Sequence, residues 1–240
     1  MQDPLERADS LLDAAGLNLR GALAAPDYDA RVPPAWRLAE WLPGARSVWV
    51  IGSGGPALWS ALEASGRAAE RDPLDAHTAR ALARCVALLR EAGQNARAAF
   101  AHERRAGAYA DLVALGHAAG LGAPSRLGLL LHPLYGPWLS LRALLATTLA
   151  LPASAPLAGF DPCHGCPAPC ASACHGRAVS PTGFEVARCA ATRRREPRCR
   201  LRCDARHACV LGQAHAYEDA AEAHHMRHAS PEASVETGNE

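Results

Sequence analysis

Apolar residues recur at helical spacing over four segments of the chain. The segments run from Leu5 to Ala25, over the PALWSALEAS stretch that starts at Pro56, from Asp72 to Leu89, and from Tyr109 to Ala119. Side chains three and four positions apart share one face of a helix, so each segment predicts an amphipathic helix. Asp72 lies directly before a proline, which is a typical start signal for the third of them.

Two other apolar segments have a different pattern. SVWVIG, from Ser47 to Gly52, is a short β-branched run before a glycine cluster and predicts a buried strand. RLGLLLHPLYGPWLSLRALLATTLAL holds two apolar runs separated by residues 132–138, where two prolines and a glycine exclude a continuous helix. We therefore expect a strand, a tight loop and a second strand. Helices that flank strands indicate an α/β or α+β fold with one sheet.

The length and composition indicate one main domain with a small appended module. The chain has 240 residues, of which 49% are hydrophobic, enough to bury one core. We expect a first domain over residues 1–155, a cysteine-rich module over residues 156–229, and a disordered tail over residues 230–240. The tail is rich in serine, glutamate and glycine, which do not supply a core.

Charge and cysteine usage narrow the possible classes of protein. A formal net charge of +1 excludes a globally basic chain that coats nucleic acid. The first residues, MQDPLERADSLLDAAG, lack the basic start and apolar centre of a signal peptide, and no apolar run is long enough to span a membrane. We therefore expect a cytoplasmic protein with no membrane partner. Structural disulfides are uncommon in that compartment, so clustered cysteines there predict metal ligands.

Eight of the nine cysteines lie within one short part of the chain. They are Cys163, Cys166, Cys170, Cys174, Cys189, Cys199, Cys203 and Cys209. Close spacing brings several thiolates to one point at little cost in loop closure, and eight ligands suit two 4Fe-4S clusters. In two-cluster ferredoxins the fourth cysteine of a run binds the other cluster. The first three cysteines are therefore expected to join Cys209, and Cys174 to join the later three. Cys85 is expected to be a buried packing residue in a helix.

Zinc is the alternative metal, because paired cysteines also build closed four-thiolate sites. Zinc ribbons place two short cysteine pairs apart, whereas this chain has four cysteines in one run, which favours clusters. Eight arginines lie among the later cysteines. Their charge would offset the negative charge of a thiolate-bound cluster, or would bind RNA phosphates.

The stretch from Ala119 to Cys209 resembles the epoxyqueuosine reductase family, the cobalamin-dependent enzymes of tRNA queuosine synthesis. The resemblance rests on AGLG, on LLLHPLYGPWLSLRALLATTLALP and on the two sets of cysteines. It implies a nitroreductase-like sheet-and-helix domain that binds cobalamin, followed by a ferredoxin-like iron–sulfur module. Asp75, in the sequence Asp-Ala-His, matches the aspartate of the family's Asp-Tyr-His motif, the proposed proton donor. Capping of its own helix is the alternative role for Asp75.

The first domain also resembles the cobalamin-processing family of methylmalonic aciduria and homocystinuria type C. RDPLDAHTARALARC and HPLYGPWLSLR carry this resemblance. It implies that the loop of residues 132–138 faces a corrinoid. The residues expected to contact that cofactor are His132, Tyr135, Gly136 and Trp138.

These observations predict an iron–sulfur oxidoreductase or electron-transfer protein. Two 4Fe-4S clusters would pass electrons to a corrinoid or a substrate in the first domain, with cobalamin as the second cofactor. The expected partners are an electron donor such as a flavodoxin or ferredoxin, and a small-molecule or tRNA substrate. The alternatives are a cobalamin-processing chaperone or ferredoxin-like carrier with no substrate of its own, and a zinc-stabilised RNA-binding module.

Overall fold

The computed structural model describes residues 3–228, which form two compact units. Unit 1 holds residues 3–122 and 139–158, and unit 2 holds residues 123–138 and 159–228. The expected disordered tail, residues 230–240, lies outside the described residues. In the part of the chain that the structure covers, no helix combines the length and the apolar character needed to cross a bilayer.

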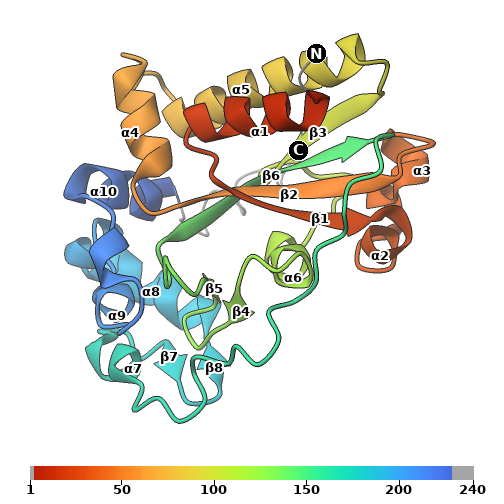
Figure 1. Cartoon of the computed structure of the whole chain (residues 1–240). Helices are drawn as coiled ribbons and strands as arrows, with labels where there is room; N and C mark the ends of the chain where they lie inside the picture. The colour runs from red at the N-terminus through yellow and green to blue at the C-terminus, as the bar shows by residue number, and fades with distance from the viewer. Residues whose placement is uncertain (1–2, 229–240) are drawn as a thin grey trace. The chain divides into compact units, whose positions relative to one another are not determined.

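Unit 1 is a mixed helix-and-sheet unit (Figure 1). Its elements are α1 (Pro4–Ala14), β1 (Leu19–Ala24), α2 (Ala25–Asp29), the 3₁₀ helix η1 (Pro34–Trp36), α3 (Leu38–Trp41), β2 (Ser47–Gly54), α4 (Ala57–Ala64), α5 (Pro73–Glu91), β3 (Ala96–Phe100), α6 (Leu112–Ala118) and β6 (Leu139–Thr147). The strands pair in the order β1-β2-β6-β3, and every pairing is antiparallel. This architecture agrees with the mixed fold class expected from the sequence.

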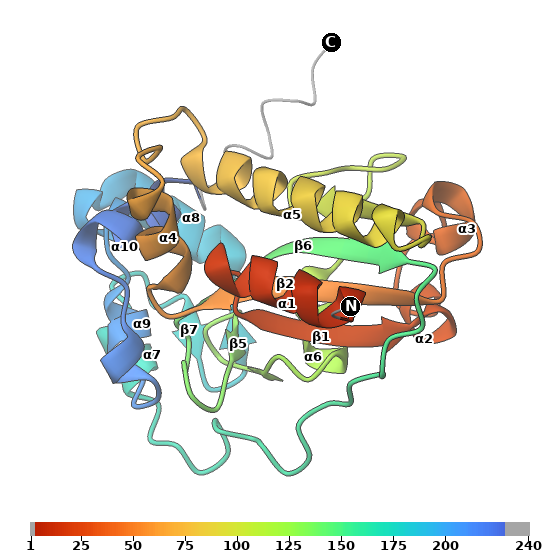
Figure 2. The ribbon, with the colours of Figure 1, turned by 45° about the horizontal axis from the view of Figure 1, so that its top comes forward.

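Helices cover both faces of this sheet. Figures 1 and 2 show α1 and α5 side by side on one face, and α6 on the other. The core between the sheet and the first face contains Leu12 of α1, Trp49 and Ile51 of β2, and Leu82 and Cys85 of α5, all nearly inaccessible. Cys85 is thus a packing residue, as expected, and burial raises the pKa of its thiol to about 11.

The register of β2 and β6 shifts within the sheet. Ile51 pairs with Ala143 while Gly52 pairs with Leu141, so Arg142 is the extra residue of a bulge in β6. A bulge bends its strand and re-aims the side chain at the extra position. The Arg142 side chain reaches the first turn of α5, where it meets Asp75.

The structure confirms several predicted elements and corrects others. The SVWVIG strand is β2, and the helix opened by Asp72 is α5. The predicted helix over Leu5 to Ala25 is wrong beyond Ala14, because its second half forms β1. The chain turns at Gly16, whose φ is +74° and where a Cβ atom would lie 2.3 Å from the carbonyl oxygen of Ala57. Only glycine meets both conditions without strain.

Three further elements differ from expectation. β3 was not predicted, because ARAAF has no β-branched residue. The helix expected from Tyr109 begins at Leu112 instead, since Asp111 caps it by accepting a 2.9 Å hydrogen bond from the Ala114 amide. Of the first apolar run before the 132–138 loop, only Leu130 and Leu131 form a strand.

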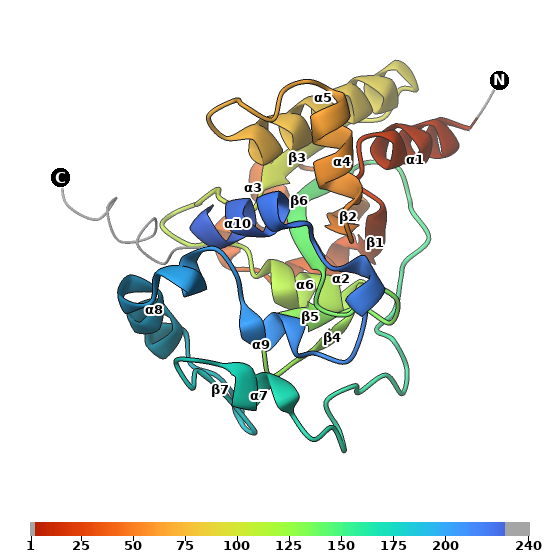
Figure 3. The ribbon, with the colours of Figure 1, turned by 90° about the vertical axis from the view of Figure 1, so that its left-hand side faces the viewer.

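Unit 2 is built from short elements joined by turns (Figure 3). They are β4 (Ala123–Pro124), β5 (Leu130–Leu131), α7 (Pro169–Ala173), β7 (Val179–Ser180), β8 (Gly183–Phe184), α8 (Val186–Arg195), η2 (Pro197–Arg200), α9 (Asp204–His207), η3 (Gln213–His215) and α10 (Asp219–His228). Within this unit α7 packs against α9, and both α8 and α10 pack against η2.

Residues 123–138 belong to unit 2, although the sequence placed them in the first domain. Leu127 and Leu131 are buried together with Cys170, Val179 and Ala205 of the later segment. These apolar residues form a core too small to stabilise a module alone. A segment from the middle of the chain thus completes the cysteine-rich unit.

Candidate metal centres

Four of the eight cysteines line one hollow of unit 2. Cys163, Cys166, Cys170 and Cys209 line this hollow together with the apolar side chains of Leu127, Leu131 and Leu211. Cys170 lies in the first turn of α7, which begins at Pro169 after a left-handed residue with φ of +55° at Ala168. The proline fits the first helical position, where no amide hydrogen is needed.

The other four cysteines line a second hollow of the same unit. They are Cys174, Cys189, Cys199 and Cys203. They come from four places, namely the end of α7, the middle of α8, η2 and the residue before α9. The amide of Ala178 donates a 3.3 Å hydrogen bond to the Cys174 sulfur. Amide hydrogen bonds to sulfur are among the interactions that tune thiolate-bound clusters.

The two hollows divide the cysteines as the sequence spacing indicated. Cys209 lies with the first three cysteines of the run, and Cys174 lies with the three later ones. Cys174 and Cys209 are thus exchanged between the early and the late set of cysteines. This exchange follows from the packing of α7 against α9, because Cys174 directly follows α7 and Cys209 lies two residues after α9. Each set consists of four cysteine sulfurs.

Burial raises the pKa of five of these thiols. Burial raises the pKa of Cys203 and Cys209, and neighbouring cysteines of the same hollow raise it further. The same two causes raise the pKa of Cys170, Cys189 and Cys199. Four thiolates in one hollow therefore require a positively charged group among them, and its binding would release protons.

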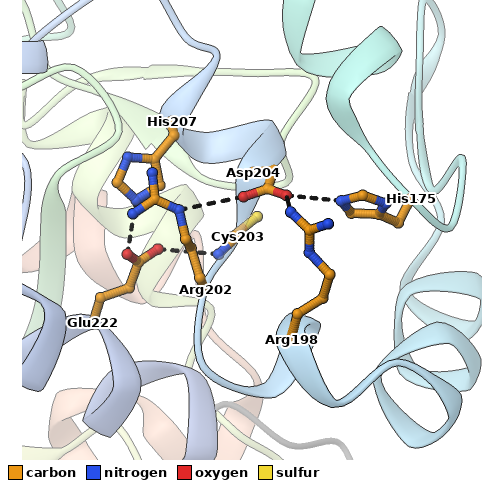
Figure 4. A network of polar contacts seen from close by, with 7 residues as sticks. All are labelled: His175, Arg198, Arg202, Cys203, Asp204, His207 and Glu222. Carbon is orange, nitrogen blue, oxygen red and sulfur yellow. Dashed lines mark hydrogen bonds and ion pairs between the residues drawn. The ribbon is translucent and has the colours of Figure 1, made fainter.

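A carboxylate holds two arginine side chains and a histidine side chain at the rim of the second hollow. Asp204 accepts from Nε2 of His175 at 2.7 Å and from Nε of Arg202 at 3.3 Å, and it also pairs with Arg198 (Figure 4). The hydrogen bond from His175, together with the charge of Arg198, lowers the pKa of the Asp204 carboxyl. Asp204 stays ionised and fixes these side chains around the cysteines.

A second carboxylate connects α9 with α10. Glu222 is 1% exposed, and its oxygens accept from the amide of Cys203 at 3.0 Å and meet Nε2 of His207 at 2.7 Å (Figure 4). Sequence reasoning found neither Asp204 nor Glu222. The signal for Asp204 was its place directly after Cys203, whereas nothing near Glu222 in the sequence marks it.

The loop of residues 132–138 packs within unit 2. The amides and carbonyls of His132 and Gly136 exchange hydrogen bonds of 2.8 and 2.9 Å. Tyr135 lies between the rings of His132 and His215, at 4.9 and 5.0 Å. Burial lowers the pKa of His132, so its ring is neutral at pH 7. A Cβ atom at Gly136 would lie 2.3 Å from the carbonyl oxygen of Leu211.

Trp138 is almost completely buried, with 1% exposure. The guanidinium of Arg206 lies 4.7 Å from its ring centre and donates to the Pro137 carbonyl at 2.6 and 3.0 Å. The ring of His207 packs edge-on against the Trp138 ring, and the two ring centres lie 4.7 Å apart. Gly136 and Trp138 thus contact the C-terminal segment, whereas His132 and Tyr135 remain partly exposed.

Asp75 lies in unit 1, in the first turn of α5. The helix begins at Pro73, so Asp72 is the capping position and the alternative capping role for Asp75 is wrong. The Asp75 carboxylate pairs with the largely buried guanidinium of Arg142 and lies 3.4 Å from Nδ1 of His102. It is 48% exposed.

An antiparallel sheet covered by helices, with a unit that holds two groups of four cysteines, defines a mixed helix-and-sheet fold similar to that of epoxyqueuosine reductase. The enzyme from Bacillus subtilis matches with a TM-score of 0.60 at 16% identity, over 90% of this chain and 68% of that chain. Epoxyqueuosine reductase with a tRNA-Tyr epoxyqueuosine-modified stem loop matches with a TM-score of 0.61 at 14% identity, over 92% and 67%.

The catabolic reductive dehalogenase NpRdhA, in complex with 3-bromo-4-hydroxybenzoic acid, has a similar fold. Its TM-score is 0.56 at 19% identity, over 97% of this chain and 35% of the dehalogenase. No family model and no curated protein matches the chain. The likeness to the solved structures concerns the fold, and it agrees with the resemblance to epoxyqueuosine reductase stated from the sequence.

Proposed function

We propose that this protein is an iron–sulfur oxidoreductase whose unit 2 binds two 4Fe-4S clusters. One observation carries the proposal: eight cysteines occupy two separate hollows, four to each. A 4Fe-4S cluster takes four cysteine thiolates, so each hollow supplies one complete ligand set. When bound, such clusters accept and pass on single electrons.

The arrangement of the cysteines along the chain supports clusters over zinc. Zinc ribbons place two short cysteine pairs apart, whereas Cys163, Cys166, Cys170 and Cys174 lie in one run. The first three members of that run line the first hollow and Cys174 lines the second. In two-cluster ferredoxins the fourth cysteine of a run likewise binds the other cluster.

Arginine side chains at the second hollow suit a negatively charged cluster. Arg193 is 6% exposed and lines the hollow together with Arg202. A cluster with four thiolates carries net negative charge, and a buried guanidinium beside it reduces the free energy cost of that charge. This arrangement favours the reduced form of the cluster, which carries more negative charge.

A corrinoid is the second part of the proposal. It is supported by the resemblance to one cobalamin-dependent family and one cobalamin-processing family, and by the fold that this chain shares with epoxyqueuosine reductase. The partly exposed His132 and Tyr135 are the loop residues that suit contact with such a cofactor, whereas Gly136 and Trp138 serve the packing of the loop.

Asp75 is the proposed proton donor. The neighbour bound to a tRNA stem loop supports a tRNA substrate beside a small molecule.

Metal analysis of anaerobically reconstituted protein tests the central proposal. We expect about eight irons and about eight sulfides per chain, and absorption near 400 nm that bleaches on reduction. The Cys166→Ala variant should retain about four irons, because only the first hollow loses a ligand. One or two zinc ions with no iron would contradict the proposal and favour the zinc-stabilised alternative. A Ser60→Ala variant is a matched control, since Ser60 lines neither hollow.

A further inference from the structure

Exposed arginines are concentrated in the chain segment that contains Cys199 of the second hollow. They are Arg194, Arg195, Arg198, Arg200 and Arg202, and we refer to them as the arginine patch. The segment from 194 to 202 runs from the end of α8 through η2, and it contains Cys199 of the second hollow. Its single acidic residue is Glu196. The patch is therefore strongly positive within a chain of nearly neutral net charge.

The patch is partly fixed in place before any partner binds. Asp204 holds Arg198 and Arg202, two members of the patch, and also His175 (Figure 4). Because one carboxylate faces two guanidinium groups, the net charge stays positive. Side chains that are already ordered lose less conformational entropy when a partner docks.

We propose that the arginine patch is the docking surface for an acidic electron-donor protein. The inference rests on the proposed function, because it assumes a cluster in the second hollow. Arg202 and Cys199 line that same hollow, so a partner seated on the patch lies next to the cluster ligands. The step that docking serves moves one electron from the donor to the chain; no bond forms and no proton moves.

The chemistry of the patch favours a protein over a nucleic acid. Leu201 lies within the patch and is 49% exposed. Arginine beside apolar side chains is typical of protein interfaces. Proteins that bind single-stranded RNA supply aromatic side chains for base stacking, and residues 185–204 contain none. An acidic surface on the partner would complement the charge and speed the encounter.

Affinity for an acidic flavodoxin, used in its oxidised form, tests the docking surface. The Arg195→Glu/Arg200→Glu variant reverses two charges of the patch that line neither hollow. At about 0.01 M salt, where the Debye length is about 30 Å, we expect its dissociation constant to rise at least about tenfold. At about 1 M salt, where that length is about 3 Å, it should match the wild type. Arg71→Glu/Arg84→Glu changes two exposed arginines of unit 1 and should bind as the wild type does.

Iron content measured on the same samples distinguishes a failure of the proposed function from a failure of the docking surface alone. Protein without iron contradicts the proposed function. Protein with its full iron content and equal affinity in both double variants contradicts the docking surface alone. An RNA stem loop serves as the competitor. If the RNA stem loop binds the wild type more tightly than the flavodoxin does, and fails to bind the Arg195→Glu/Arg200→Glu variant, the surface binds nucleic acid and the inference is overturned. Stopped-flow reduction by the reduced flavodoxin should slow in the patch variant, whereas reduction by a small photoreduced deazaflavin should not.

Discussion

Nε2 of His207 lies 2.7 Å from Oε2 of Glu222, and the carboxylate is almost completely buried. Its other oxygen accepts the amide hydrogen of Cys203 at 3.0 Å. One side chain of α10 thereby fixes both the backbone of a proposed cluster ligand and the imidazole that packs on Trp138. Glu222 is a positioning residue for the second hollow, since it does not line that hollow itself.

Replacing Glu222 by leucine should destabilise unit 2. The variant leaves the Cys203 amide and the His207 ring without their acceptor, and lost hydrogen bonds to a charged group cost about 2–3 kcal/mol. For a chain of this size we expect the melting temperature to fall by roughly 4–12 °C under anaerobic conditions. Iron at the second hollow should also fall, while Glu222→Gln should retain most of it. Glu218→Gln, an exposed change directly before the same helix, is the control. An unchanged melting temperature in the leucine variant would contradict the positioning role.

Gly136→Ala should disturb the first hollow. The sequence alone placed this loop in the first domain, but a Cβ atom at Gly136 would collide with the backbone of Leu211, two residues after Cys209 of the first hollow. We expect loss of about half of the iron, because the first hollow takes one of the two clusters. Gly107→Ala provides the control: Gly107 has a φ of +78° with nothing within 4 Å of its Cβ position, so it carries the backbone strain without the collision. Full iron content in Gly136→Ala would show that the backbone at Leu211 moves freely.

Local patterns in the sequence predicted those parts of the fold that depend on neighbouring residues. β2 is a compact β-branched run, and α5 has both a start signal and helical spacing. The prediction missed β1 because LRGALA continues the apolar spacing of the helix before it. Only the approach of Gly16 to Ala57 forces the chain to turn there. β3 is a strand because it pairs with β6, a partner about 45 positions away in the chain.

In the candidate site, too, the features that depend on nearby residues could be predicted, and those that depend on distant residues could not. The cysteines were found because their type and spacing carry the signal for metal binding. The partners of Glu222 and Asp204 lie up to 29 positions away, so no short pattern contains them. The loop of residues 132–138 was predicted as a loop, but its contacts with Arg206 and Leu211 depend on tertiary packing.

Asp75→Asn tests a catalytic role against a structural one. The Asp75–Arg142 pair joins α5 to the bulge of β6, but the carboxylate is about half exposed, and such pairs contribute about 1 kcal/mol or less. We therefore expect the melting temperature to fall by no more than about 2–4 °C, and the iron content to stay unchanged. Turnover of an epoxyqueuosine-containing tRNA stem loop should be lost if Asp75 is the proton donor. Glu63→Gln, an exposed change on α4, is the control. A much larger fall in melting temperature would mean that the pair is mainly structural.

Paired cysteine substitutions test the division of the ligands between the two hollows. Cys163→Ala/Cys209→Ala removes two ligands of the first hollow, whereas Cys209→Ala/Cys189→Ala removes one from each. If each hollow holds one 4Fe-4S cluster, the first variant keeps about four irons and the second keeps almost none. The comparison is sharp because both variants lack two cysteines and differ only in where these lie. Cys85→Ala leaves both hollows intact and should keep about eight irons, since Cys85 belongs to the core of unit 1. Equal iron content in the two double variants would mean that Cys209 does not share a cluster with Cys163, and the two groups of four would have to be drawn again.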